Sequence, residues 1–431
     1  MKALFARVVV PALLLLALSK RPLAAEEREA TLSPNQRPRI VVTDQARTLH
    51  RECLVFDGHN DLPWTMRTKA GSSFDSADIA GMLPNFHTDI PRLRAGGVGA
   101  VFWSAYVPAD ASKDRVAAHQ VLEQIDLIQQ MVRRYPETFE LAKSADDVVR
   151  IRKAGKIASL IGLEGGHAIE NSLSLLRMYF NLGARYMTLT HSDTLDWADA
   201  ATDEARHGGL TPFGEEVVQT MNELGMLVDI SHVSADTMRD VLRVSRSPVI
   251  ASHSSAYAVA PHPRNVPDDV LKLVKMNRGV VMVNFYSGFV VAESARARAK
   301  MFDVRRELEA RFPDPKEFEK AYEQWQKANP IQPGSIHDVV DHIDHIVKIA
   351  GIDHVGLGSD YDGVSMLPAQ LEDVSTFPNI TQALLDRGYS EGDVHKVMGG
   401  NTLRVFREAG AVARTLQTKG TSQTPEESNP R

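Results

Sequence analysis

A histidine and an aspartate, His59 and Asp61, stand two residues apart where a short apolar run ends. In an extended strand, residues i and i+2 point to the same side, so these two side chains are expected to converge. An imidazole and a carboxylate that meet in this way are suited to hold a divalent metal ion. The pair alone is a weak signal, because His-x-Asp arises by chance. It gains weight only if later strands also end in metal-ligand residues.

Other short apolar runs do end in acidic or imidazole side chains. The pattern predicts strands over residues 54–57, 98–103, 157–163, 186–190, 226–230, 249–251, 280–284 and 355–358, with helical periodicity between them, for example at 172–181, 212–224 and 267–276. Continuous apolar strands are typical of parallel sheets buried on both faces. Strand–helix alternation repeated about eight times favours a (β/α)8 barrel of the TIM type, with the active site at the carboxyl ends of its strands. An open doubly wound sheet is the alternative, but it would not gather ligands from nearly every strand.

Five potential metal ligands fall at these strand ends: His59, Asp61, Glu164, His232 and His253. A tetrahedral zinc ion that keeps one position open for water needs fewer protein ligands than these five residues offer. The set suits two ions if one carboxylate bridges them. Glu164 is the natural bridge, because its strand lies between the first-strand pair and the two later histidines. Two ions roughly 3.5–4 Å apart would share a hydroxide placed for attack on a polarised carbonyl.

Asp360 ends the last predicted strand, which adjoins the first strand in a closed barrel. There it could accept a proton from the nucleophile and return it to a leaving amine. Each residue also has a purely structural interpretation: a lone strand-end histidine is more often a hydrogen-bonded core group, Glu164 could cap a helix, and Asp360 could form a turn. Because that interpretation requires several independent coincidences on separate βα units, a shared metal site is favoured.

A second group of histidines, His337, His342 and His345, alternates with aspartates on a predicted helix. The spacing of His342 and His345 would suit a metal ion. A charged, regularly spaced face is also typical of a solvated helix, and this interpretation is preferred.

Composition and charge indicate a globular protein. The 431 residues are 43% hydrophobic and 24% charged, as in an ordinary globular protein with an ample core, and a barrel of this size is routinely one domain. The net charge of −6, without a basic patch interleaved with aromatics, gives no hint of nucleic-acid binding. The only cysteine, Cys53, excludes an intramolecular disulfide and is expected to be a small buried apolar residue.

The two ends of the chain are predicted to lie outside the catalytic domain, which is expected over residues 51–416. Two basic residues, the apolar run 8–18 and a pair of alanines predict a signal peptide over residues 1–25 for export to a bacterial periplasm. The alanine pair followed by a glutamate favours its removal, which would leave no stable membrane anchor, and an uncleaved anchor is the alternative. Residues 26–50 are an N-terminal extension, and the polar tail 417–431 is expected to be disordered.

One segment interrupts the barrel pattern. Residues 292–329, between the seventh and eighth predicted strands, are rich in charged and aromatic residues and predict one or two amphipathic helices, split near Pro313. Insertions of this kind often act as lids or oligomer contacts, and a solvated helical pair without function is an equal alternative.

These motifs together resemble the membrane (renal-type) dipeptidase family, within the metal-dependent amidohydrolase barrels. The matching motifs are DGHND (57–61), GLEGG (162–166), LTHS (189–192), DISHVS (229–234), SHSSAY (252–257), RNVPDD (264–269) and GSDYDG (358–363). They span nearly the whole predicted barrel and are highly specific as a set. The insertion exceeds the short connection expected in the family, so side-chain preference stays open.

The resemblance implies a two-zinc dipeptidase acting on L–L and L–D dipeptides, and a homodimer by family analogy. It implies one zinc ion on His59, Asp61 and Glu164 and another on Glu164, His232 and His253. Asp360 would be the proton shuttle, His191 would polarise the scissile carbonyl, and Arg264 would clamp the substrate carboxylate.

Two other functions compete with this one. A phosphotriesterase or lactonase of the same barrel group usually carries His-x-His on the first strand, whereas this chain has His59 and Asp61. A metal-free binding or scaffold protein would be expected to lack part of the ligand set, and every expected position is filled.

Overall fold

Eight parallel strands close into a barrel in the computed structural model, which describes residues 37–421. The strands are β1 (Val55–Asn60), β2 (Val98–Tyr106), β4 (Ile157–Glu164), β5 (Ala184–Thr188), β6 (Leu227–Asp229), β7 (Ile250–Ala251), β8 (Val280–Val283) and β9 (Val355–Leu357). The barrel closes where β2 pairs with β4, and β9 lies beside β1 as expected for the last and first strands. The predicted (β/α)8 fold is confirmed.

A ninth strand, β3 (Phe139–Leu141), has no counterpart among the predicted strands. It pairs with the first residues of β4, and β5 pairs with the later residues of β4 from Ile161 onward. A run of three residues is too short to carry a periodic signal, which explains why the sequence pattern missed it.

Both faces of the strands are buried, and the two faces belong to different cores. The inner cluster includes Phe56, Phe102, Leu160, Tyr186 and Met282, which alternate along the strands with residues of the outer cluster that packs against the helices. Helix α18 (Asn401–Thr421) adds Phe406 to the inner cluster. This double burial positions the strand ends rigidly, as a fixed frame for the polar residues that follow them.

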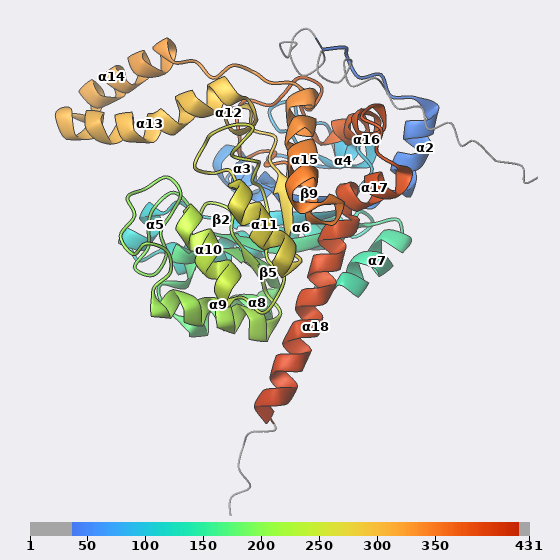
Figure 1. Ribbon diagram of the computed structural model, residues 1–431, viewed down its shortest axis with the longest axis horizontal. Coiled ribbons are helices and arrows are strands. Elements are labelled where there is room, and N and C mark those ends of the chain that lie inside the picture. Colours follow the sequence, from blue (N-terminus) through green and yellow to red (C-terminus); the bar gives the residue numbers. More distant parts are fainter. Residues whose placement is uncertain (1–36, 422–431) are drawn as a thin grey trace, which may run out of the picture. The chain divides into compact units, whose positions relative to one another are not determined.

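Helices follow the strands around the barrel (Figure 1). The main ones are α3 (Leu62–Ala70), α6 (Ala117–Arg134), α7 (Ala145–Lys153), α8 (Leu173–Leu182), α9 (Pro212–Leu224), α10 (Ala235–Val244), α11 (Asp268–Asn277), α15 (Ile336–Ala350) and α16 (Phe377–Asp386). Three of them, α8, α9 and α11, confirm the helices predicted from periodicity. Thr211 and Ser234 cap α9 and α10 by accepting hydrogen bonds from backbone N–H groups of the first turn.

The segment between β8 and β9 contains two helices, α13 (Ala292–Arg311) and α14 (Pro315–Ala328). Asp314 caps α14 with its side chain, and Pro315 occupies the first turn, where its missing N–H costs nothing. Figure 1 shows the two helices lying side by side as a hairpin. The predicted split near Pro313 is therefore confirmed.

The boundaries of the compact unit differ from those expected. The unit begins at Ile40, and α2 (Asp44–Glu52) packs on α16, with Ala46, Leu49 and His50 buried. The backbone N–H and the hydroxyl of Thr43 both donate to Gln382 Oε1, at 2.9 and 2.8 Å. Residues 40–50 thus belong to the folded unit and not to a separate extension.

At the carboxyl end, the prediction of a disordered tail from residue 417 is wrong for its first residues, because α18 continues to Thr421. Gln417 on this helix donates to the Glu223 carbonyl at 2.8 Å. The remainder of the tail, residues 422–431, lies outside the described residues.

None of the helices within residues 37–421 is long and apolar enough to cross a membrane. The predicted signal peptide, residues 1–25, lies outside the described residues, and export to the periplasm stays a prediction. Cys53 is fully buried directly before β1, and burial raises the pKa of its thiol to about 11, in agreement with a structural role.

Candidate metal centre

The predicted site residues follow strand ends around the barrel and gather at one place. His59 lies within β1, and Glu164 is the last residue of β4. The others lie in the loops after their strands: Asp61 after β1, His191 after β5, His232 after β6, His253 and Arg264 after β7, and Asp360 after β9. Three overlapping groups of potential metal ligands connect seven of these residues: His59, Glu164 and His253; Glu164, His191 and His232; His59, Asp61 and Asp360.

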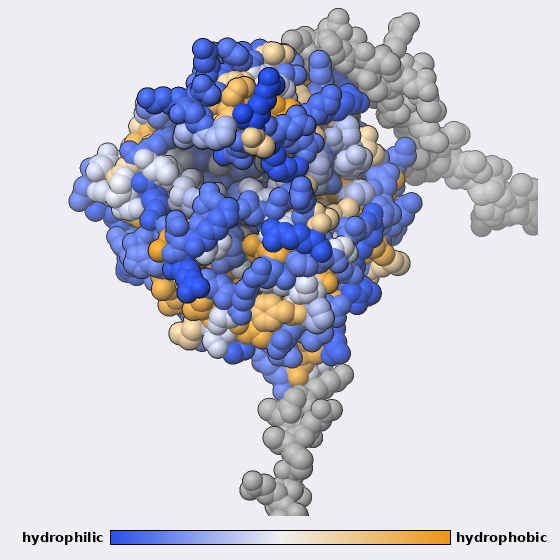
Figure 2. Space-filling view, turned by 90° about the vertical axis from the view of Figure 1, so that its left-hand side faces the viewer, coloured by the Kyte–Doolittle hydropathy of each residue, from blue (hydrophilic) through white to orange (hydrophobic). Residues whose placement is uncertain are grey.

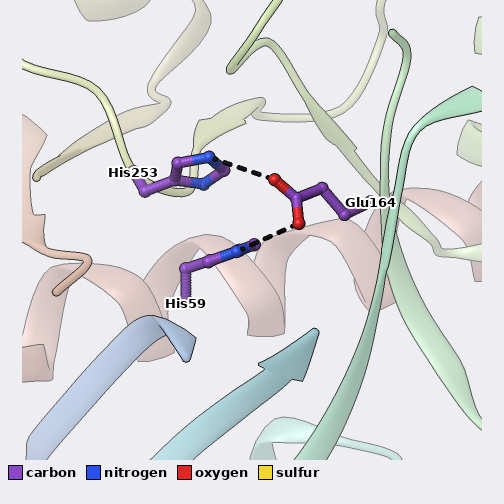
Figure 3. Close-up of side chains that lie close together, drawn as sticks. All are labelled: His59, Glu164 and His253. Atoms are coloured by element: carbon purple, nitrogen blue, oxygen red, sulfur yellow. Dashed lines mark ion pairs between the residues drawn. The ribbon is translucent and has the colours of Figure 1, made fainter. Parts of the chain in front are cut away.

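Glu164 lies at the centre of the cluster, with imidazoles on both of its carboxylate oxygens (Figure 3). Its Oε2 is 3.4 Å from His59 Nε2, and its Oε1 is 3.1 Å from His232 Nε2 and 3.5 Å from His253 Nε2. Ser104 donates a hydrogen bond to Oε2 at 2.9 Å. A carboxylate approached from both oxygens by separate nitrogen ligands is the arrangement that a bridging ligand requires.

The imidazoles are oriented by hydroxyl groups behind them. His59 Nδ1 lies 2.7 Å from the hydroxyl of Tyr186, and His253 Nδ1 lies 2.7 Å from Ser252 Oγ. Each of these rings therefore turns its Nε2 toward the cluster, and the Nε2 atoms of His232 and His253 are only 2.9 Å apart. Partners of this kind behind a ligand fix the ring and its tautomer.

Burial sets the protonation states that metal binding needs. It lowers the pKa of His232 and of His253 well below the ordinary value, and nearby Arg264 acts in the same direction, so both rings are neutral. Burial alone would raise the pKa of Glu164, but His59 and the hydrogen bonds from His232 and His59 hold it well below its usual range. Two neutral imidazoles beside an ionised carboxylate fit zinc. At His59 burial lowers the pKa, but Tyr186, Asp61 and Glu164 outweigh it and hold the pKa well above its ordinary value, so a metal ion bound there would displace a proton.

Asp61 and Asp360 complete the cluster on the β1 side. His59 Nε2 lies 3.1 Å from Asp61 Oδ2, and Asn284 donates to Asp360 Oδ2 at 2.7 Å. Burial, reinforced by Asp61, raises the pKa of Asp360 above its usual range. Asp360 and His232 have φ values of 63° and 67°, a left-handed conformation that is uncommon outside glycine and that concentrates at functional sites.

His191 lies at the edge of the cluster, with its side chain 18% exposed. Its Nδ1 is 2.9 Å from Ser192 Oγ, and its Nε2 is 3.6 Å from Glu164 Oε1. Burial lowers the pKa of this ring to about 4. The ring is therefore uncharged at neutral pH, with a proton on only one of its two nitrogens. A neutral imidazole at the cavity wall is placed to donate a hydrogen bond to a substrate oxygen.

Arg264 is 2% exposed and yet lines the cavity. Its Nη1 donates to Ser254 Oγ and its Nη2 to the His253 carbonyl, both at 3.3 Å, whereas its buried Nε has no hydrogen-bond partner within residues 37–421. Burial lowers its pKa to about 10, which leaves the group charged at neutral pH. A buried guanidinium with an unused donor favours an anion beside it.

Two buried carboxylates that the sequence interpretation passed over hold the site loops, and they do so in the same way. Asp57 accepts from the backbone N–H of His59 and from both the N–H and the hydroxyl of Ser359. Asp229 accepts from the N–H of Ser231 and from both the N–H and the hydroxyl of Ser252. Each carboxylate thus ties its own strand end to the serine that precedes a site residue on another strand, Asp360 or His253. The signal was available: an aspartate stands two or three residues before His59 and His232.

We expect Asp229→Asn to weaken metal binding by about 10- to 100-fold, the usual effect of losing a partner behind a metal ligand. Asp229 Oδ2 accepts from the hydroxyls of Ser252 and Thr188 at 2.6 and 2.5 Å, and an amide nitrogen in that place cannot accept both. Zinc affinity would be measured by titration against a competing chelator. Asp236→Asn, on the exposed face of α10, is the matched control. Unchanged affinity in Asp229→Asn would contradict the positioning role.

The interpretation of the second histidine group as solvated is wrong for His342, which is fully buried on α15. Its Nδ1 accepts from the backbone N–H of Ala256 at 2.9 Å, and its Nε2 lies 3.1 Å from the Val290 carbonyl. Both nitrogens are engaged by backbone, so His342 is a structural residue and its spacing to His345 does not mark a metal site. His345 instead pairs with Asp268 at 2.7 Å.

A cavity of about 810 Å³ opens over the cluster. Its wall includes Asp61, Glu164, His191, His232, Arg264 and Asp360, together with residues from α3 and α13. The face drawn in Figure 2 is hollowed in its upper half, and mostly hydrophilic residues surround the hollow. The space exceeds what two small amino acid residues occupy, so larger side chains can be accepted.

Comparison with known proteins agrees with this site. The family model of the membrane dipeptidases, peptidase family M19, matches residues 43–420. The fold is similar to the probable dipeptidase PvdM from Pseudomonas aeruginosa, with 26% identity, a TM-score of 0.74, and coverage of 86% of this chain and 98% of that one. It is also similar to a metallopeptidase from Rhodobacter sphaeroides that was solved with a phosphinate mimic of the dipeptide L-Ala-D-Ala, with 25% identity, a TM-score of 0.67, and coverage of 83% and 99%.

A third solved structure, described as the dipeptidase AC, a metallopeptidase, matches with 25% identity and a TM-score of 0.68 over 83% of this chain and 98% of that one. The family model covers the whole barrel, including every predicted site residue, and it favours a dipeptidase over a phosphotriesterase or lactonase. The buried cluster of histidine, glutamate and aspartate fits the metal dependence of such enzymes. The chain belongs to the membrane dipeptidase family, peptidase family M19, and is a metal-dependent peptidase.

Proposed function

We propose that this enzyme is a binuclear zinc dipeptidase that accepts an L or a D residue on the carboxyl side of its substrate. The observation that carries the proposal is the central Glu164, whose two oxygens face His59 on one side and His232 and His253 on the other. Two groups of ligands that share one carboxylate favour two ions over one. The dipeptide mimic bound by the Rhodobacter sphaeroides relative supports L–D substrates.

When bound, the zinc ions would supply a water of lowered pKa as nucleophile and Lewis-acid polarisation of the carbonyl. The side chains around them have separate tasks. Arg264 binds the C-terminal carboxylate of the substrate through its unpartnered Nε, and a peptide with further residues places no carboxylate at that distance from the scissile bond. His191 donates a hydrogen bond to the carbonyl oxygen as negative charge develops there.

Asp360 is the proton carrier in this proposal. Asn284 fixes its Oδ2, and its Oδ1 remains for proton exchange at the cavity wall. Its raised pKa brings proton gain and loss closer to neutral pH than is usual for a carboxyl group. Asp360 therefore takes a proton as the nucleophile attacks and delivers it to the nitrogen of the leaving amino acid.

We expect the purified enzyme to contain two zinc ions per chain and to hydrolyse both L-Ala-L-Ala and L-Ala-D-Ala. A strong chelator should abolish both activities, and added zinc should restore them, because the zinc ions would supply both the nucleophilic water and the polarisation of the carbonyl. Metal content would be measured by elemental analysis, and tri-L-alanine serves as the substrate control. Chelator-insensitive hydrolysis, or no stoichiometric zinc, would refute the proposal, and hydrolysis of the tripeptide at the same rate would refute its restriction to dipeptides.

A further inference from the structure

One face of the inserted helix α13 forms part of the cavity wall. Arg298, Met301 and Arg305 line the cavity, and their spacing of three and four residues places them on the same side of the helix. Met301 is 7% exposed, so the helix packs closely at this point. The insertion thus brings two guanidinium groups to the cavity, at a place where only a short connection was expected.

The charges in the cavity are unevenly distributed. Asp61, Glu164 and Asp360 belong to the metal-ligand cluster, and the fourth acidic residue of the wall, Asp362, accepts a hydrogen bond from the His87 backbone. The basic residues are Arg264, Lys69 on α3, and the two arginines of α13. Hydroxyl-bearing residues such as Thr68 and Ser365 fill much of the remaining wall. Outside the metal centre, the charged side chains of the cavity wall are therefore mostly basic.

Arg298 is linked to the carboxylate clamp by a chain of aromatic contacts. The Arg264 guanidinium carbon lies 5.4 Å from the centre of the Phe289 ring, this ring is 4.9 Å from the Tyr286 ring, and the Arg298 guanidinium carbon lies 5.8 Å from Tyr286. All four residues line the cavity. Both arginines also lower the pKa of His262, after burial, which places them on the same side of the site. A substrate residue held by Arg264 therefore has Arg298 further along the same aromatic wall.

We propose that Arg298, supported by Arg305, forms a subsite for an acidic side chain on the carboxyl-side residue of the dipeptide. This inference rests on the proposed dipeptidase function and names the substrate class within it. A guanidinium matches a carboxylate in shape and pairs with it through two parallel hydrogen bonds. Arg305 now pairs with Glu309 at 2.8 Å, one turn further along α13. That pair is exposed and therefore weak, so it does not prevent Arg305 from turning to an anionic ligand.

The test compares isosteric substrates that differ only in charge. For the wild-type enzyme, kcat/KM for L-Ala-L-Glu should exceed that for L-Ala-L-Gln by about tenfold or more, the usual scale for a charge-assisted hydrogen bond. The reversed pair, L-Glu-L-Ala and L-Gln-L-Ala, should show a much smaller ratio, because the amino-side residue does not lie beside Arg264. In Arg298→Ala the ratio of kcat/KM for L-Ala-L-Glu to that for L-Ala-L-Gln should fall by about tenfold, and in Arg305→Ala it should fall by less. Arg298→Lys keeps the charge and should retain part of this preference.

Arg296→Ala is the matched control, since Arg296 is an exposed residue of the same helix that does not line the cavity. It should leave the ratio unchanged. A wild-type enzyme without preference for L-Ala-L-Glu, or a ratio that persists in the double variant of Arg298 and Arg305, overturns the subsite. An equal loss on both substrates also overturns it, because the arginines would then act on the fold alone. Failure to hydrolyse any of the four dipeptides would instead refute the proposed function itself.

Discussion

Replacing Asp360 by asparagine should lower kcat by about 10²- to 10⁴-fold, the range typical of losing a general acid–base group. The amide has nearly the same shape as the carboxyl group and keeps a partner for Asn284, which now donates to Asp360 at 2.7 Å. It cannot, however, accept a proton and return it. The change therefore separates proton transfer from packing at a residue that is 8% exposed. The measurement is kcat with L-Ala-L-Ala at saturating substrate, together with zinc content.

Zinc content decides between the two roles that the geometry allows for Asp360. Its carboxylate lies close enough to His59 and Asp61 to share a metal ion with them. We expect Asp360→Asn to retain full zinc occupancy, which identifies a proton carrier and not an essential ligand. Asn284→Ala removes the hydrogen bond but keeps the carboxyl group, so it should cost much less activity. Full activity in Asp360→Asn, or loss of zinc in parallel with activity, would contradict the assignment.

The barrel and the ligand cluster could be predicted because topology constrains them together. Parallel strands in a closed barrel all end at one rim, so polar residues that directly follow apolar runs must meet there. His59, Glu164 and His253 come from strands far apart in the sequence, yet this rule alone brings them within reach of one another, as Figure 3 shows. No knowledge of individual contacts was needed for that step.

Other features depend on contacts that a linear pattern does not encode. The spacing of Asp57 and Asp229 to His59 and His232 is visible in the sequence, but it does not show which serines on other strands these carboxylates bind. His342 stands in a polar, regularly spaced helix, but two other segments provide backbone partners for its nitrogens: Ala256 in the loop after β7, and Val290 at the end of the short helix α12 (Ser287–Val290). Packing against other elements, and not the local composition of the helix, determines that His342 is buried.

The orientation of the inserted helix α13 also could not be predicted from the sequence. Basic residues occur all along α13, so the sequence indicated a charged helical segment but not which face approaches the site. Packing of Met301 against the body orients the helix and turns Arg298 and Arg305 toward the cavity. The proposed subsite therefore assigns substrate preference to an added element, whereas the residues of the metal centre lie at the barrel rim.

Replacing Arg264 should reduce kcat/KM for L-Ala-L-Ala by about 10²- to 10³-fold in Arg264→Ala, because a buried charge pair with the substrate carboxylate is lost. Arg264→Lys should recover only part of the loss. A lysine supplies the charge but not the planar set of donors that bonds Ser254, the His253 carbonyl and the substrate at the same time. The measurement is kcat and KM of each variant with L-Ala-L-Ala.

The control must separate substrate binding from structural damage, since Arg264 also packs on Phe289 at 5.4 Å. L-Ala-L-alaninamide has the same scissile bond but no terminal carboxylate. The wild-type enzyme should therefore prefer the free dipeptide over this amide by a large factor, and Arg264→Ala should bring the ratio close to one while zinc content stays constant. If the variant instead loses activity on both substrates equally, Arg264 stabilises the His253 loop and does not bind the carboxylate. The ratio, and not the absolute rate, is what identifies the residue that restricts this enzyme to dipeptides.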